Sequence, residues 1–179
     1  MTKRVRKLLS YSEKATAVDG VGIVLRDGIR KVLGRSAADR ALRGEWLGHP
    51  LHPALVSLPI GAWTAATLFD NFTDDAVASR RLLGIGLVSL GGVLTTGWAD
   101  WSVGDERQRR VGLIHAAGNA TAATLIFASY VRRRGGGEPD SVTKALSAGA
   151  LPLVGAAGAL GGHLAYALGS GTAHGVPSR

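Results

Sequence analysis

The chain has 179 residues and no cysteine, and 46% of its residues are hydrophobic. This length allows one domain, and a chain without cysteine excludes disulfides, thiolate metal sites and cysteine catalysis. The formal net charge of +8 invites a nucleic-acid function. We expect no nucleic-acid partner, because the basic residues are not interleaved with the aromatic residues on which bases stack.

The first 45 residues precede the apolar part of the chain. Residues 1–17 are charged and lack apolar periodicity, so we expect them to be loosely ordered. Over residues 18–32, apolar side chains recur every three or four positions opposite a charged arc, which predicts an amphipathic helix lying flat in a membrane interface. A helix that docks on a soluble partner is the alternative. Ser36 is placed to cap a second, short helix. We interpret residues 1–45 as a cytoplasmic, interfacial segment.

Four apolar stretches follow, separated by charged ones. A helix needs about 20 apolar residues to cross a hydrocarbon core roughly 30 Å thick, and each stretch reaches or approaches that length. The first is the weakest, because it must include the prolines at its start. Pro50 or Pro53 marks that start, and Pro59 is expected to kink the helix. The four stretches are residues 51–69, 82–99, 111–131 and 145–169.

The predicted fold is therefore all-α, an integral membrane four-helix bundle with an N-terminal amphipathic interfacial helix. The transmembrane domain covers residues 46–171, and a polar tail covers residues 172–179. Of the 21 Lys and Arg, 15 lie on the side of the two termini and six on the other. The positive-inside rule thus favours both termini in the cytoplasm, although the basic triplet at 132–134 argues the other way. The lipid bilayer is the first expected partner.

Four of the five histidines fall at span ends that share one side of the membrane. With a rise of about 1.5 Å per residue, His115 lies roughly 6 Å into the third span and His163 about 26 Å along the antiparallel fourth. Ionisable side chains at membrane depth are costly, and they usually pair or mark a functional site. The candidate cluster contains His49, His52, Asp100, His115 and His163, supported by the polar side chains of Asn119 and Tyr166 one turn away.

Three interpretations of this cluster stay open. In the first, His49, His52, His115 and His163 bind a redox cofactor, with haem b as the leading case because imidazoles from facing helices suit axial iron positions. In the second, these histidines and Asp100 bind a transition metal ion such as zinc, copper or iron. In the third, the cluster is structural and satisfies polar groups at the headgroup level.

No motif for hydrolysis or phosphate binding accompanies the cluster, so we do not expect an enzyme acting on its own. Our leading hypothesis is a haem- or metal-binding subunit of a membrane redox system, with a redox partner protein in the same membrane. The alternative is a non-enzymatic membrane scaffold or assembly factor whose polar cluster is structural. A homo-oligomer is compatible with either hypothesis.

The run Gly48-His49-Pro50-Leu51-His52-Pro53 resembles the opening signature of an uncharacterised family of bacterial four-helix predicted membrane proteins. Later pieces fit in order: Gly97-Trp98-Ala99-Asp100-Trp101, His115 with Asn119, and Gly161-Gly162-His163-Leu164-Ala165-Tyr166. The resemblance covers residues 46–171 and implies a four-helix fold in a bacterial cytoplasmic membrane, with no established activity. Some members are joined to a Rieske-type iron–sulfur domain, which implies redox work. This chain has no cysteine, so an iron–sulfur partner would be a separate protein.

Overall fold

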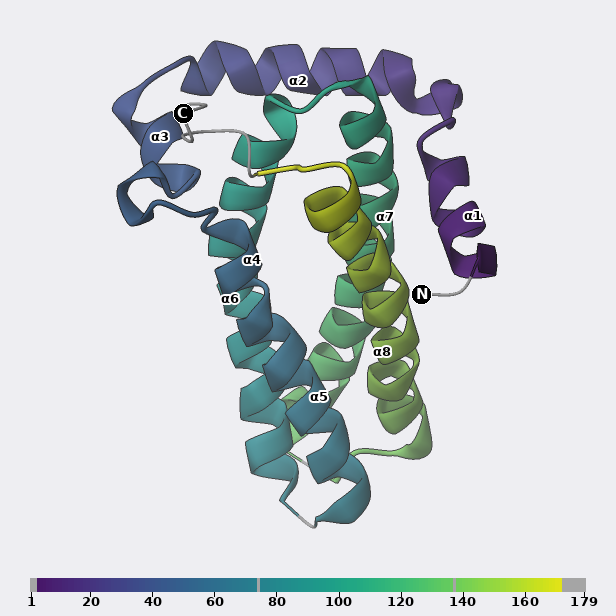
Figure 1. Cartoon of the computed structure of the whole chain (residues 1–179). Helices are drawn as coiled ribbons and strands as arrows, with labels where there is room; N and C mark the ends of the chain where they lie inside the picture. Colours follow the sequence, from purple (N-terminus) through teal and green to yellow (C-terminus); the bar gives the residue numbers. More distant parts are fainter. Residues whose placement is uncertain (1–2, 74, 137, 172–179) are drawn as a thin grey trace. The chain divides into compact units, whose positions relative to one another are not determined.

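A computed structural model describes residues 3–73, 75–136 and 138–171, and these residues form helices and connections with no strand among them. The predicted polar tail, residues 172–179, lies outside this range. The α-helices are α1 (Lys3–Ser12), α2 (Asp19–Leu33), α3 (Ala37–Leu42), α4 (His52–Leu55), α5 (Ser57–Phe72), α6 (Ala76–Ser102), α7 (Glu106–Arg132) and α8 (Ser141–Gly162) (Figure 1). Short helical turns are η1 (Thr16–Val18), η2 (Glu45–Leu47), η3 (Arg133–Gly135) and the π-helical η4 (His163–Ala167).

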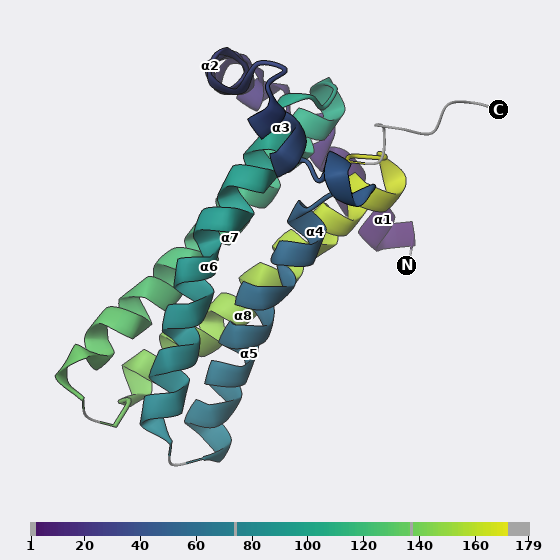
Figure 2. The ribbon, with the colours of Figure 1, turned by 90° about the vertical axis from the view of Figure 1, so that its left-hand side faces the viewer.

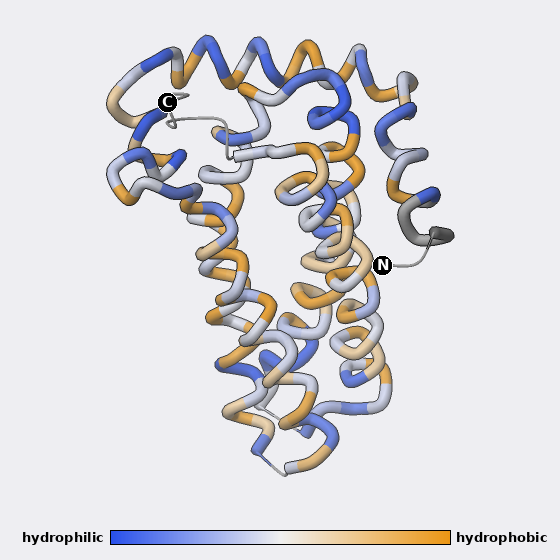
Figure 3. Tube along the Cα trace, viewed as in Figure 1, coloured by the Kyte–Doolittle hydropathy of each residue, from blue (hydrophilic) through white to orange (hydrophobic). Residues whose placement is uncertain are grey.

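Among the residues that the structure describes, three helical stretches are long and apolar enough to cross a membrane. They are Ala76–Ser102, Glu106–Gly135 and Ser141–Ala167, and they coincide with the second, third and most of the fourth predicted span. Figure 3 shows hydrophobic residues along these helices, whereas hydrophilic residues gather in the N-terminal segment and the connections. Their outward side chains include Val88, which is 83% exposed. An exposed apolar surface of this kind is typical of helices that face lipid.

The first predicted span is divided. Helix α4 ends at Leu55, and α5 has 16 residues, fewer than the roughly 20 that a crossing helix requires. The disturbance expected from Pro59 is present one turn before it. Pro59 has no N–H to donate to the carbonyl of Leu55, and the helix is interrupted at Val56, directly after Leu55. Whether α4 and α5 together cross the membrane stays a prediction.

One compact unit, which we call the core unit, comprises Ala54–Val93 and Ala117–Ala157. It contains α5 and parts of α6, α7 and α8, which run alongside one another in both views (Figures 1 and 2). Trp63 lies against the backbone of Gly86, where a Cβ would stand 2.2 Å from the indole Nε1. Glycine is therefore the residue that lets the two helices approach. The buried cluster consists of Trp63, Ala66, Leu83, Ala122, Ile126, Ala150 and Val154.

The second unit, the histidine unit, comprises Met1–Pro53, Leu94–Ala116 and Gly158–Arg179. Within it, α2 crosses the end of α6 and the start of α7 (Figures 1 and 2). The predicted cap is confirmed, because the Ser36 hydroxyl accepts the N–H of Asp39 at 3.1 Å. The expectation of a loosely ordered start is wrong, because Lys3–Ser12 is helical. Leu9 is buried there, and tertiary burial of this kind stabilises a helix that local periodicity does not predict.

Candidate functional site: the histidine unit and a buried ion pair

His163 has one ring nitrogen paired and one unpaired. Its Nε2 lies 2.8 Å from the Glu13 carboxylate oxygen Oε1. Its Nδ1 is buried and has no hydrogen-bond partner among the described residues. When Nε2 carries the proton and donates to Glu13, Nδ1 keeps a lone pair inside the protein. A carboxylate that orients an imidazole in this way is the arrangement commonly found behind metal-ligating histidines.

The local backbone at His163 is a π-helical turn. The N–H of Leu168 donates to the carbonyl of His163 at 3.1 Å, a bond that spans five residues. Such bulges are rare and frequently occur at functional sites. The turn directs His163 inward, whereas the Tyr166 side chain on the same turn is 94% exposed. The expected support of the histidine by Tyr166 is therefore not made by a direct contact in the structure.

Two other histidine rings lie against glycines. A Cβ built on Gly161 would stand 3.1 Å from Cε1 of His115, so the His115 ring packs on α8 two residues before His163. A Cβ built on Gly97 would stand 2.8 Å from Cε1 of His52. The His52 Nδ1 also lies 3.5 Å from the Thr96 hydroxyl. Small residues on α6 and α8 thus make room for imidazoles of α4 and α7.

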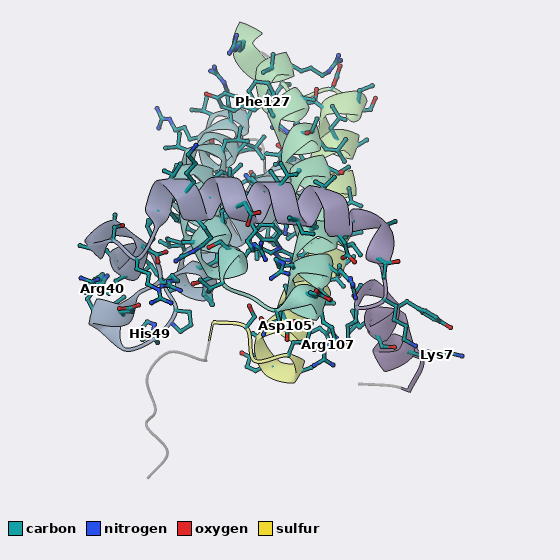
Figure 4. The ribbon with its side chains drawn as sticks, turned by 90° about the horizontal axis from the view of Figure 1, so that it is seen from above. Lys7, Arg40, His49, Asp105, Arg107 and Phe127 are labelled. Carbon is teal, nitrogen blue, oxygen red and sulfur yellow. The ribbon has the colours of Figure 1, made fainter. Side chains whose placement is uncertain are left out.

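The other candidate residues, His49, Asp100 and Asn119, lie in different surroundings from these histidines. His49 is exposed, and its Nδ1 lies 3.2 Å from the carbonyl of Pro50; Figure 4 shows it at the edge of the histidine unit. Asp100 lies in electrostatic range of Arg43, which directly follows α3, and of Asp39 on α3. Asn119 belongs to the core unit.

All four candidate histidines and Asp100 therefore belong to the same unit. Among residues 3–73, 75–136 and 138–171, no three His, Cys, Asp or Glu side chains form a group that could hold a metal ion.

Glu13 contacts His163, and the sequence alone did not predict this contact. It is separated from His163 by 150 residues, and it lies in a stretch expected to be loose. Its second carboxylate oxygen is 3.8 Å from Arg107, and the Glu13 carbonyl accepts from Arg110 at 3.2 Å. No local pattern predicts such a pairing, because the three partners meet only through tertiary packing.

An ion pair between α2 and α7 completes the attachment of the N-terminal segment. Arg110 donates to both carboxylate oxygens of Asp19 at 2.6 Å. The hydrogen bond from Arg110, assisted by the charges of Arg110 and Arg109, lowers the pKa of Asp19 from its ordinary value. Bidentate Arg–carboxylate pairs are geometrically specific. Helix α2 is thus held at the first turns of α7.

A second polar site that the sequence did not indicate lies inside the core unit. Arg133 donates to both oxygens of Asp70 at 2.7 and 2.6 Å, and the two side chains are only 3% and 0% exposed. Three serine hydroxyls surround the pair within hydrogen-bond distance of the guanidinium: Ser79, Ser129 and Ser147. The members come from α5, α6, α7, η3 and α8. Because every partner is provided by the protein, this network fixes helix packing within the core unit.

A known protein family matches most of the chain. Residues 48–174 match the family described as "Predicted membrane protein (DUF2231)". The chain belongs to this family. The match includes all four candidate histidines and the Asp70–Arg133 pair, and it leaves Glu13 and α2 outside. The function of the family is unknown. No curated protein and no solved structure gives a significant match.

Proposed function

We propose that this DUF2231 member is a multi-pass protein of the bacterial cytoplasmic membrane that binds haem b or a transition metal ion in its histidine unit. It would act as a subunit of a membrane redox system beside a separate redox partner. In this proposal α4 and α5 form the first of four spans, and both termini lie in the cytoplasm. The proposal rests on the three apolar helices, the charge distribution and the family match.

The observation that carries the cofactor proposal is the buried, unpartnered Nδ1 of His163. A buried polar atom without a partner is costly, so its presence in a packed site calls for an explanation such as a ligand. The Glu13 contact on Nε2 supports the neutral imidazole tautomer that a metal ion needs. His163 is therefore the first candidate ligand.

Haem is the leading cofactor in the proposal. A haem iron takes only one or two ligands from the protein, because the porphyrin supplies the other four. His115, whose ring packs on Gly161, is the first candidate for a second ligand beside His163. A bare metal ion needs more protein ligands, and its candidate set extends to His49, His52 and Asp100; because no three of these side chains form a group among the described residues, haem is the better fit.

A haemin titration of the purified protein in detergent tests this proposal. We expect the wild-type protein to give a saturable Soret shift at one haem per chain, and His163→Ala or His115→Ala to abolish it. Glu13→Gln is expected to weaken binding by about 10–100-fold, the usual effect of losing a carboxylate behind a ligating histidine. Asp27→Asn, which alters an exposed ion pair with Arg26 in the same N-terminal segment, is the matched control and should bind like the wild type. Circular dichroism confirms that each variant is folded.

A structural role of the histidines, in a non-enzymatic scaffold or assembly factor, is the second candidate function. The observation that favours it is the same His163–Glu13 contact, since this pair ties the N-terminal segment to α8. The scaffold hypothesis predicts no saturable Soret shift and no stoichiometric metal in the wild-type protein. It also predicts that His163→Ala and Glu13→Gln lower thermal stability by similar amounts. A redox partner and a homo-oligomer remain proposals under both functions.

A further inference from the structure

Helix α2 carries an apolar flank that the described part of the chain does not cover. Relative to Gly22, which faces α7, a step of about 100° per residue places Val21, Val24, Leu25, Gly28 and Val32 on one side of the helix. These residues are exposed, with Val24 at 72% and Val32 at 84%. The opposite side carries the charged side chains of α2, Asp19, Arg26, Asp27, Arg30 and Lys31, with the exposed Ile23 among them. The line of contact with α7 thus separates an apolar flank from a mainly charged flank.

The height of α2 along α7 is defined by two contacts. Gly22 lies against Leu113, where a Cβ would stand 3.5 Å from the Leu113 side chain, and Asp19 holds Arg110. Both α7 residues lie in its first turns, where the charged run at 106–110 gives way to apolar residues from Val111. In a membrane that transition marks the boundary between headgroups and hydrocarbon. Helix α2 therefore lies at that boundary. Its apolar flank is exposed to the same environment as the first turns of α7.

The charge around α2 complements an anionic surface. Residues 1–48 contain 11 Lys and Arg against five acidic residues. Of these cations, Lys14, Lys31 and Arg35 are exposed, and their side chains make no ion pair with any described residue. Trp46, whose side chain is exposed, follows on the same segment. Exposed indoles and lysines beside an apolar flank are typical of helices that bind anionic lipid headgroups.

We infer that the apolar flank of α2 binds the acyl boundary of the bilayer while Lys14, Lys31 and Arg35 bind anionic lipid headgroups. The inference rests on the membrane placement under the proposed function and names the lipid class that its N-terminal segment recognises. It concerns a surface outside the residues that match the family. It does not depend on any cofactor in the histidine unit.

Single cysteines test the position of α2, because the natural chain contains none. The full-length protein is reconstituted in nanodiscs of phosphatidylcholine and phosphatidylglycerol, and Val24→Cys and Asp27→Cys are each labelled with bimane. We expect the label at 24 to be quenched by brominated lipid and protected from iodide, and the label at 27 to show the reverse. Equal iodide quenching at both positions would overturn the inference. A label at 24 shielded from both quenchers would also overturn it, because a protein would then cover the flank.

Val88→Cys on α6 separates this outcome from a failure of the membrane placement. Its side chain is exposed on a candidate span, so its label must be quenched by brominated lipid if the chain crosses the bilayer. Failure at 88 overturns the membrane placement and the inference together, whereas failure at 24 alone overturns only the inference.

The headgroup preference is tested by replacing the three exposed cations. Each cation near an anionic surface strengthens binding roughly fivefold. We expect the iodide protection of Val24→Cys to be stronger with phosphatidylglycerol than with phosphatidylcholine alone, and the variant with Lys14→Gln, Lys31→Gln and Arg35→Gln to lose that difference. If the iodide protection of Val24→Cys does not depend on lipid charge while Lys14, Lys31 and Arg35 are intact, the proposed preference for anionic headgroups is contradicted.

Discussion

At the scale of single residues, the Asp70–Arg133 ion pair depends on hydrogen bonds from the side chains around it. Both charges are removed from solvent, and a buried ion pair is tolerated only when its geometry is good and its remaining hydrogen-bonding groups are satisfied. The serine hydroxyls meet that condition. Removing one partner would leave the other charge buried and uncompensated.

We therefore expect Asp70→Asn to lower the free energy of unfolding by about 3–5 kcal/mol. Urea or SDS unfolding in detergent, followed by circular dichroism, measures this change. Arg132→Gln is the matched control. It removes an exposed ion pair with Asp140 from the same region and should cost less than about 1 kcal/mol. Similar losses for the two variants would contradict the burial of the Asp70–Arg133 pair.

Gly86 tests the packing of the core unit. A Cβ at this position would overlap the Trp63 ring, so Gly86→Ala should cost about 1–3 kcal/mol through overpacking. Gly155→Ala is the control, because a Cβ at 155 meets nothing within 4 Å. In a helix interior that change should stabilise by roughly 0.5–1 kcal/mol. Thermal unfolding of the two variants measures both effects, and a neutral Gly86→Ala would mean that Trp63 does not lie where we describe it.

Asp140 should give the connection before α8 a pH dependence. The Thr143 hydroxyl, the Thr143 N–H and Arg132 all bond to this carboxylate and lower its pKa to about 2. Because the folded pKa lies below the ordinary value near 4, the stabilisation is complete above about pH 4 and is lost as the pH falls toward 2. The stability difference between the wild type and Asp140→Asn should therefore be constant at neutral pH and disappear in acid. A difference that is as large at pH 2 as at neutral pH would contradict this account.

At the scale of elements, α2 depends on its contact with α7. Asp19→Asn removes the charge that holds Arg110, so we expect faster amide hydrogen exchange across α2 and unchanged exchange in α8. Asp27→Asn is the control, since Asp27 is exposed and pairs only with its neighbour Arg26 among the described residues. Hydrogen exchange measured by mass spectrometry in detergent compares the two variants. If the amides of α2 exchange equally slowly in Asp19→Asn and in the wild type, the ion pair does not hold the helix.

Length and hydropathy predicted three spans well, because a crossing helix requires about 20 apolar residues whatever it packs against. The interruption at Val56 falls one turn before Pro59, where the missing N–H of a proline is expected to break the helix. The π-helical turn at His163 was not predicted, because apolar composition does not distinguish an α-helical turn from a widened one. Helix α1 was missed for a related reason, since its burial of Leu9 depends on distant partners.

At the scale of the whole molecule, helix direction predicts that the candidate histidines lie near one end of the spans, because the rise per residue and the antiparallel order determine their depth. All four belong to the histidine unit, but no three His, Cys, Asp or Glu side chains among the described residues form a group that could hold a metal ion. Their convergence on one ligand stays a prediction. The partners of these side chains were not predictable. Glu13 reaches His163 across 150 residues, and Asp70 meets Arg133 across 63 residues. Pairing depends on side-chain geometry, which spacing along one chain does not contain.

The most direct test of the central claim is a reduced-minus-oxidised visible spectrum of the purified protein, with metal analysis of the same sample. Expression with haem and transition metals supplied is required. The account predicts a Soret band that shifts on reduction and is lost in His163→Ala or His115→Ala, or stoichiometric metal lost in the same variants. A colourless, metal-free protein whose histidine variants differ from the wild type only in stability would contradict it and leave the scaffold function.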